Sequence, residues 1–193
     1  YTDPHMWFKG SRRGSIDQCF PSKVAIAHVH NLIFDKKVKP DIILFPIVQS
    51  LRTELTNTMD SAACPVVSIT PEVIKAAYTQ EGDVFAANGI QYLAPSFDMA
   101  NWPLFELQIY ECFRDVLKIT SEESKEAVDI AFAAWRRFFE VTLRPEARKV
   151  IDRLEEEGKV GVVMLGRPYH NDPGLNHEIM AGLQRKGYPI FGI

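Results

Sequence analysis

Apolar residues along the chain follow two spacings, one typical of helices and one typical of strands buried on both faces. Over residues 21–33 they recur at helical intervals, which predicts a helix with a broad buried face. Short β-branched runs bounded by proline or glycine predict buried strands. We expect these strands at residues 41–45, 65–69, 89–95, 160–166 and 188–193. Two further helices are predicted at residues 71–78 and about 174–186, and polar residues predict loops at 1–18 and a loop or helix at 50–61.

The middle section, residues 101–157, has helical spacing throughout and almost no glycine. Ser121 is predicted to cap a helix there, with Ser124 in the place where a capping box carries glutamate. Aromatic residues at helical intervals predict a stripe of core side chains. They are Phe132, Trp135, Phe138 and Phe139. Gly158 is expected to end the last helix of this section.

Strands that alternate with helices predict right-handed crossovers and parallel sheets. We therefore expect an α/β protein of Rossmann-like parallel-sheet lobes joined by a helical section. The predicted division is a first α/β lobe at residues 1–100, a helical section at 101–157 and the start of a second α/β lobe at 158–193. Because the chain begins without methionine and stops within a predicted strand, we expect it to be a fragment of a longer protein with an incomplete second lobe.

Composition narrows the range of functions. Apolar residues make up 46% of the 193 residues and charged residues 24%, as in soluble globular proteins. The net charge of −3 gives no basic footprint for nucleic acid. No apolar run reaches the roughly 18 residues that a membrane span needs, and the first residues lack the apolar core of an export signal. We therefore expect a cytoplasmic protein that binds neither nucleic acid nor membrane and keeps its three cysteines reduced.

The segment CFPSK, residues 19–23, places a cysteine at a predicted helix start. Pro21 favours the first turn of a helix, so Cys19 is expected at the N-cap or one residue before it. Unpaired N–H groups and the positive end of the helix dipole favour a thiolate there, and Lys23 adds a cation. A thiolate at this position suits a ligand of a metal or an iron–sulfur cluster. A buried structural cysteine is the alternative.

The other two cysteines differ in their surroundings. Cys64 precedes Pro65 at the mouth of the predicted strand at residues 65–69, and neither it nor Cys19 belongs to a CxxC pair. Two cysteines from separate loops are compatible with a cluster that is assembled in space. Cys112 lies among apolar residues of a predicted helix and is interpreted as a core thiol.

The segment GRPYHNDPGLNHEI, residues 166–179, follows a predicted buried strand and leads into a helix. Parallel α/β sheets bind their ligands beyond the carboxyl ends of their strands, which is where this segment falls. The candidate binding residues are Arg167, Tyr169, His170 and His177. Gly174 and the N–H groups of the helix start are a candidate anion site, whereas a loop that only caps the helix is the alternative. The chain has no Walker A, GxGxxG or GxSxG motif.

Four segments together carry a resemblance to a known family. They are CFPSK with HVHNL, PDIILFP, CPVVSITPEVI and GRPYHNDPGLNHEI. In this order they resemble a domain of the large 2-hydroxyacyl-CoA dehydratase activators, the CoA-substrate-specific enzyme activases. That domain is similar to dehydratase subunits and to double-cubane-cluster reductases. The resemblance covers nearly the whole chain, and GRPYH is its most diagnostic part.

The resemblance implies an oxygen-sensitive iron–sulfur cluster, of 4Fe-4S type, whose cysteine ligands fall on Cys19 and Cys64 as metal ligands. A third ligand is expected beyond Ile193. The implied partners are an actin-like, ATP-hydrolysing activase domain, fused upstream or separate, and a 2-hydroxyacyl-CoA dehydratase-like protein. ATP would bind only on that other domain. A homodimer is also compatible with the resemblance.

The leading hypothesis is an iron–sulfur electron-transfer module of an ATP-dependent activator or reductase system for 2-hydroxyacyl-CoA dehydratase-like enzymes. In it, Lys23 and nearby N–H groups offset the negative charge of the cluster, and the chain is not an active enzyme by itself. The alternative is a non-catalytic module without a cluster, which docks the ATPase or binds a CoA thioester or anion through Arg167. A purely structural lobe is the third hypothesis.

Overall fold

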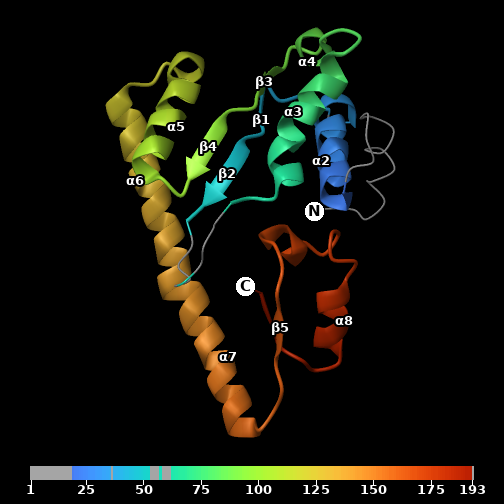
Figure 1. The fold of residues 1–193 in the computed structure, drawn as a ribbon, viewed down its shortest axis with the longest axis vertical. Coiled ribbons are helices and arrows are strands. Elements are labelled where there is room, and N and C mark those ends of the chain that lie inside the picture. The colour runs from blue at the N-terminus through green and yellow to red at the C-terminus, as the bar shows by residue number, and fades with distance from the viewer. Residues whose placement is uncertain (1–18, 36, 53–56, 58–61, 193) are drawn as a thin grey trace. The chain divides into compact units, whose positions relative to one another are not determined.

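The computed structural model describes residues 19–35, 37–52, 57 and 62–192, and the described chain is a mixed α/β protein (Figure 1). The loop predicted at residues 1–18, and most of the segment 50–61, lie outside the described residues. The described α-helices are α2 (Phe20–His30), α3 (Pro65–Thr79), α4 (Val84–Ala87), α5 (Trp102–Leu117), α6 (Ser121–Arg137), α7 (Arg144–Glu157) and α8 (Ile179–Arg185). π-Helical turns η2 (Asn31–Asp35) and η3 (Phe138–Leu143) and a 3-10 turn η4 (Pro168–Asn171) accompany them. The strands are β1 (Ile42–Leu44), β2 (Ile47–Leu51), β3 (Gln91–Leu93), β4 (Ser96–Met99), β5 (Val162–Met164) and β6 (Ile190–Gly192).

Two compact units divide the chain, with their boundary inside α6 between Val128 and Asp129. The N-terminal unit contains α2 to α5 with β1 to β4, and the C-terminal unit contains α7, α8, β5 and β6. The predicted lobe boundaries at residues 100 and 157 stay a prediction. Each unit is described by itself below.

All three strand pairs of the described chain are parallel, as the sequence predicts: β1 with β3, β2 with β4, and β5 with β6. They form two-stranded sheets, so a larger Rossmann-like sheet stays a prediction. The predicted strand at 41–45 continues past Pro46 as β2. Leu44 is opposite Leu93 and Ile47 is opposite Ser96, which places Pro46 opposite Pro95. Two hydrogen bonds span this stretch, from the Phe45 N–H to the Leu93 carbonyl and from the Ile47 N–H to the Pro95 carbonyl, both over 2.8 Å. Pro95 has no N–H group, so the ladder lacks the bond that residue 95 would donate.

The strand predicted at residues 65–69 is wrong, because these residues form the first turn of α3. The helix predicted to begin at Pro71 is also wrong in its start, since Pro71 lies inside α3. β-Branched residues suggested a strand, but the buried positions follow the helical period. Thr70, Ile74 and Tyr78 are four residues apart and are all nearly inaccessible. Burial of this face outweighs the low helix propensity of the β-branched residues and of Pro71.

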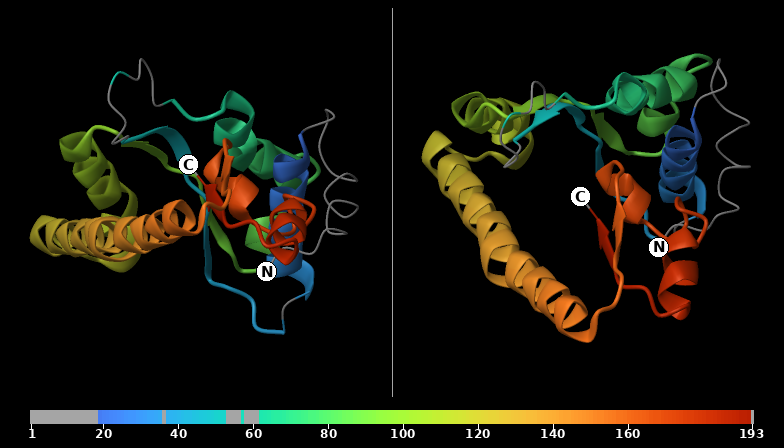
Figure 2. Two further views of the ribbon diagram at one scale, coloured as in Figure 1. Left: turned by 90° about the horizontal axis from the view of Figure 1, so that it is seen from below. Right: turned by 60° about the horizontal axis from the view of Figure 1, so that its bottom comes forward.

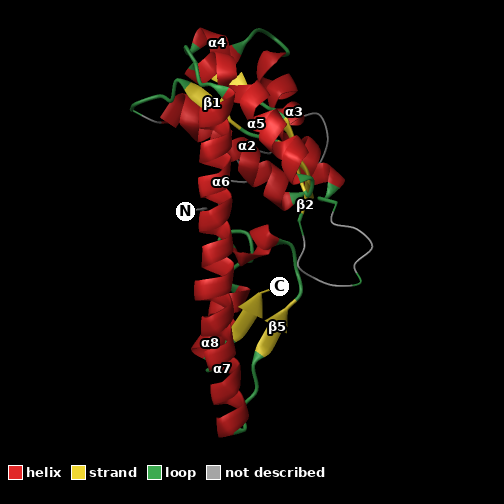
Figure 3. Ribbon diagram, turned by 90° about the vertical axis from the view of Figure 1, so that its left-hand side faces the viewer, coloured by secondary structure: helices red, strands yellow, loops and turns green. Residues whose placement is uncertain are grey.

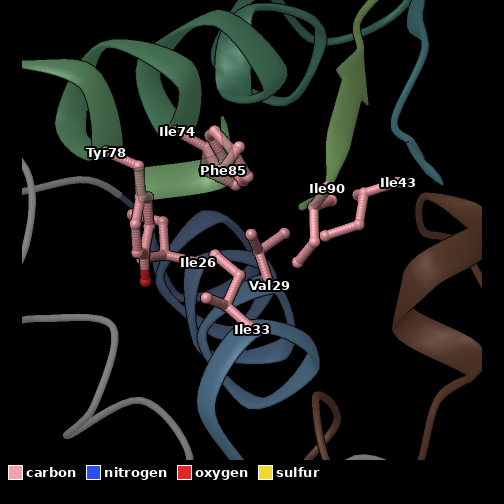
Figure 4. Packing of buried hydrophobic residues seen from close by; sticks show 8 residues of the cluster. All are labelled: Ile26, Val29, Ile33, Ile43, Ile74, Tyr78, Phe85 and Ile90. Atoms are coloured by element: carbon pink, nitrogen blue, oxygen red, sulfur yellow. The ribbon is translucent and has the colours of Figure 1, made fainter. Parts of the chain in front are cut away.

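The core of the N-terminal unit lies between α2, α3 and the start of the parallel strands (Figure 4). Its buried side chains are Ile26, Val29, Ile33, Ile43, Ile74, Tyr78, Phe85 and Ile90. The aromatic rings pack in a row, with the Tyr78 and Phe85 centroids 5.5 Å apart and the Phe85 and Tyr92 centroids 4.4 Å apart. The helix predicted at 21–33 is confirmed with its buried face.

The helical spacing predicted for residues 101–157 is confirmed by α5, α6, η3 and α7, which follow one another along this part of the chain (Figure 2, Figure 3). The capping box lies one residue earlier than predicted. The Thr120 N–H donates to Glu123 Oε2 over 2.8 Å, and the Glu123 N–H donates to Thr120 Oγ1 over 3.2 Å. Gly158 ends α7 in a left-handed conformation with φ of 60°, as predicted.

The aromatic stripe predicted for the core is only partly buried: Phe132 and Phe139 are half-buried, whereas Phe138 and Trp135 are 52% and 38% accessible. Its rings contact one another. Phe132 stacks on Trp135 with 5.6 Å between centroids, and Trp135 lies 4.9 Å from Phe139. The helical period correctly predicted that these side chains share a neighbourhood. It could not predict how much of each side chain is exposed.

In the C-terminal unit, β5 and β6 pair from Val162 opposite Ile190 to Met164 opposite Gly192. Gly161 leaves room beside this pair: a Cβ atom there would lie 2.9 Å from side-chain atoms of both Leu154 and Phe191, which would have to move. The helix predicted from about residue 174 begins only at Ile179, so that prediction is wrong by one and a half turns. No helix among the described residues has the length and apolar character needed to cross a membrane.

Candidate functional site

Cys19 begins α2, as the sequence predicts. Its backbone is extended, with φ of −62° and ψ of 157°, and its carbonyl accepts the first helical hydrogen bond, from the Lys23 N–H over 3.1 Å. Pro21 lies in the first turn, where a missing N–H group leaves no hydrogen bond unmade. The Cys19 side chain caps no N–H group and is exposed. The local sequence therefore presents this thiol at the start of a helix.

Cys64 also begins a helix, where a strand was predicted. It is the N-cap of α3, with Pro65 as the first helical residue. Two hydrogen bonds hold the chain on either side of it to β2. The Ala63 N–H donates to the Gln49 carbonyl over 2.9 Å, and Ser68 Oγ donates to the Val48 carbonyl over 2.6 Å. The partly buried Cys64 is thereby fixed beside the strand.

The helices that start at these two cysteines lie side by side and point the same way (Figure 1). Ser22 bonds Thr70 near their starts, and Tyr78 Oη lies 3.4 Å from His30 Nδ1 near their ends. Both pairs are 48 residues apart, which only a parallel arrangement allows. Cys19 precedes Ser22 by three residues and Cys64 precedes Thr70 by six. Both thiols therefore lie at the same end of the helix pair, about one helical turn out of step.

Cys112 lies in α5 and is partly buried, not in a packed core. Burial raises the pKa of its thiol above the ordinary value for cysteine. The sequence separated this cysteine correctly from the other two by its position inside a helix. It lies away from any helix start, where Cys19 and Cys64 are found.

This raised pKa gives a pH prediction. Because the thiolate is the reactive form, a raised pKa keeps Cys112 in its slow thiol form over more of the pH range. We expect its alkylation by iodoacetamide to reach half the maximal rate at a higher pH than that of N-acetylcysteine. Peptide-resolved mass spectrometry between about pH 7 and pH 10 measures this. A half-maximal pH at or below that of N-acetylcysteine would contradict the burial of this thiol.

The donor set near the helix starts consists of two thiols, which are soft ligands suited to iron–sulfur clusters. Among the described residues, no group of three or more histidine, cysteine, aspartate or glutamate side chains is placed to hold a metal ion. The chemistry of the two thiols suits such a cluster, but the described residues do not form a set of three donors.

The segment after β5 folds into η4 and a series of turns in the C-terminal unit. The Arg167 N–H donates to His170 Nδ1 over 2.9 Å, so a neutral His170 ring carries its proton on Nε2. Gly166 leaves room for this ring, since a Cβ atom there would lie 2.9 Å from His170 Nδ1 and the ring would have to move. Tyr169 lies against the His170 ring, with 4.6 Å between centroids, and Arg167 is exposed. Three of the predicted binding residues are thus adjacent in one turn.

The predicted anion site at Gly174 is not built as expected. The N–H groups of Gly174 and Leu175 donate to Asp172 Oδ1, over 2.8 and 3.1 Å. A carboxylate thus occupies the donors that an anion would need. The nearly buried Asn176 donates its amide to the His170 carbonyl over 3.1 Å, and its Oδ1 has no hydrogen-bond partner among the described residues. His177 is exposed in a left-handed conformation with φ of 52°.

These features define a class of protein: a mixed α/β chain in which two cysteines begin neighbouring parallel helices and a histidine-bearing turn follows a parallel strand. The chain belongs to the family described as the CoA enzyme activase uncharacterised domain, whose model matches residues 1–192. The resemblance stated from the four sequence segments is therefore confirmed. Comparisons with curated proteins and with solved structures found no match.

Proposed function

We propose that the chain is an iron–sulfur electron-transfer module of an ATP-dependent activator or reductase system for 2-hydroxyacyl-CoA dehydratase-like enzymes. Membership of the CoA enzyme activase domain family supports the link to an activator system. The observation that carries the cluster assignment is the parallel arrangement of α2 and α3, which gives Cys19 and Cys64 a common end. Sequence distance alone would not bring together two cysteines that are 45 residues apart.

Cys19 and Cys64 would be two of the cluster ligands, with the remaining ligands supplied from outside the described residues. Such a cluster, when bound, supplies reversible one-electron transfer. The two helices direct the positive ends of their dipoles towards the thiols, which favours negative charge at that position. Lys23, in the first turn of α2, adds a cationic side chain. The electron source in this proposal is an actin-like ATPase on another domain or chain.

Anaerobic reconstitution of the protein at its full natural length with ferrous iron and sulfide tests the proposal. The bound iron and sulfide are measured after gel filtration, together with the visible absorption and the electron paramagnetic resonance of the reduced sample. We expect iron and sulfide in near-equal amounts and a signal that dithionite generates and air abolishes. Protein that retains neither iron nor sulfide would overturn the proposal.

A second candidate is a module that binds a CoA thioester or another anion, or docks the ATPase, through the turn at Arg167. The exposure of Arg167 beyond the carboxyl end of β5 favours it. The occupation of the Gly174 and Leu175 N–H groups by Asp172 weakens it. Calorimetric titration with CoA separates the two candidates. Heat that is lost in Arg167→Ala, from protein that takes up no iron, would favour the second.

A further inference from the structure

Two buried hydroxyl groups connect the first turn of α2 with the second turn of α3. Ser22 and Thr70 are each only 2% accessible, and their oxygens lie 2.6 Å apart. Thr70 Oγ1 also donates to the Val66 carbonyl, over 2.8 Å. Either hydroxyl can donate in the Ser22–Thr70 bond; when Thr70 donates to Val66, its oxygen accepts from Ser22. The result is a chain of hydrogen bonds from Ser22 through Thr70 to Val66.

This chain of bonds ends close to both candidate ligands along the sequence. Ser22 is three residues after Cys19, and Val66 is two residues after Cys64. The remaining contacts between the two helices are largely apolar, with Ile26 and Val29 on α2 and Ile74 on α3 in one cluster. The exception is the longer polar contact of 3.4 Å between Tyr78 Oη and His30 Nδ1, which lies at the other end of the helix pair from the cysteines. Apolar contacts depend little on direction, so related packings of the helices are close in energy. A hydrogen bond of 2.6 Å between buried hydroxyls does depend on direction and distance.

A third hydroxyl on α3 completes the arrangement. Ser68 Oγ donates to the Val48 carbonyl of β2 over 2.6 Å. Ser68 thus fixes α3 against the strand, while Thr70, two residues later, fixes it against α2. Cys64 lies at the start of a helix that is held in two directions, and the helix that starts at Cys19 is held to it by one of these bonds.

We infer that Ser22 and Thr70 are positioning residues, which set the axial register of α2 against α3 and so the distance between the Cys19 and Cys64 thiols. This inference rests on the proposed function, because a cluster bound by both thiols is what gives their separation a purpose. Neither residue would contact the cluster. They would fix the positions of the two ligands in the iron-free protein.

The test measures the thiol separation without any iron. Full-length protein carrying Cys112→Ser is treated with dibromobimane, a short reagent that bridges two thiols. The Cys19–Cys64 bridge is quantified by mass spectrometry of the linked peptides, which separates it from bridges to other cysteines of the full-length protein. Thr70→Val removes the hydroxyl at nearly constant volume, and Ser22→Ala removes its partner. We expect each to slow bridging by about threefold or more, because small displacements of reacting groups have large effects on rate. Alkylation of Cys19 and of Cys64 by iodoacetamide, which needs one thiol only, should be unchanged.

Two control variants distinguish a change in the register of the helices from a general loss of structure. Thr70→Ser keeps a hydroxyl and should restore the wild-type bridging rate. Thr79→Val, near the other end of α3, removes a hydroxyl that donates to the Lys75 carbonyl of its own helix, and should have no effect. The Ser22→Ala and Thr70→Val double variant should bridge no more slowly than Thr70→Val, since both remove the same link. Circular dichroism confirms that each variant is folded.

The outcomes distinguish the inference from the function it rests on. Bridging at the wild-type rate in folded Ser22→Ala and Thr70→Val overturns the inference, whether or not the protein binds iron. If bridging depends on Thr70 but the protein takes up no iron, the register role is kept and the cluster assignment is overturned. A Cys112→Ser protein that dibromobimane cannot bridge overturns the shared position of the two thiols, and with it both proposals.

Discussion

Replacing Cys19 and Cys64 together with alanine is expected to reduce the iron bound after anaerobic reconstitution to about a tenth of the wild-type amount or less, because the cluster loses two of its thiolate ligands. Each single variant should bind less iron than the wild type and lose it faster in air. Iron and sulfide per chain, measured after gel filtration, give the result.

Cys112→Ala is the matched control for these variants. Cys112 is also a reduced cysteine of the described chain, but it lies within α5 and not at a helix start. Its replacement should leave iron and sulfide content at the wild-type level. An unchanged iron content in the Cys19→Ala and Cys64→Ala double variant would refute both ligand assignments, even if the protein carries a cluster elsewhere.

Ile74→Ala is expected to have the largest effect on stability. Ile74 is completely inaccessible and lies in the core cluster between α2, α3 and the strands (Figure 4). Removing its buried methyl and methylene groups leaves a cavity and should lower the free energy of unfolding by about 3 kcal/mol. In a protein of this size the corresponding fall in Tm is roughly 10 °C. Urea denaturation followed by circular dichroism measures the change.

Ile69→Ala makes the same chemical change on the same helix, at a side chain that is 50% accessible. It should alter the free energy of unfolding by no more than about 0.5 kcal/mol. Equal losses in Ile69→Ala and Ile74→Ala would contradict the placement of residues 65–79 in a helix with one buried face. The pair of variants thus tests the element that the sequence pattern assigned wrongly.

The sequence predicted elements best where spacing and boundary residues agreed. Pro21 and the apolar positions after it both indicated the helix α2, and Gly158 correctly marked the end of α7. The pattern failed at residues 65–69, where β-branched composition favoured a strand. The helical spacing of Thr70, Ile74 and Tyr78 would have indicated the helix, but it becomes visible only when the window extends across Pro71.

The candidate site was predictable in its residue types but not in its geometry. Proline after each cysteine indicated that Cys19 and Cys64 occupy the starts of elements. That the two helices are parallel, and joined by Ser22 and Thr70, depends on packing between segments 48 residues apart, which local patterns do not record. In the same way, nothing in the spacing around Gly174 indicated that the Asp172 side chain would take up the neighbouring N–H groups.

The central claim is that Cys19 and Cys64 bind the same group. The most direct test is thiol protection: reconstituted and iron-free protein are treated anaerobically with iodoacetamide, and the modification of each cysteine is followed by mass spectrometry. The account predicts that Cys19 and Cys64 become protected together on reconstitution, in proportion to bound iron, while Cys112 reacts equally in both samples. Modification of Cys19 and Cys64 at the same rates with and without bound iron would contradict it.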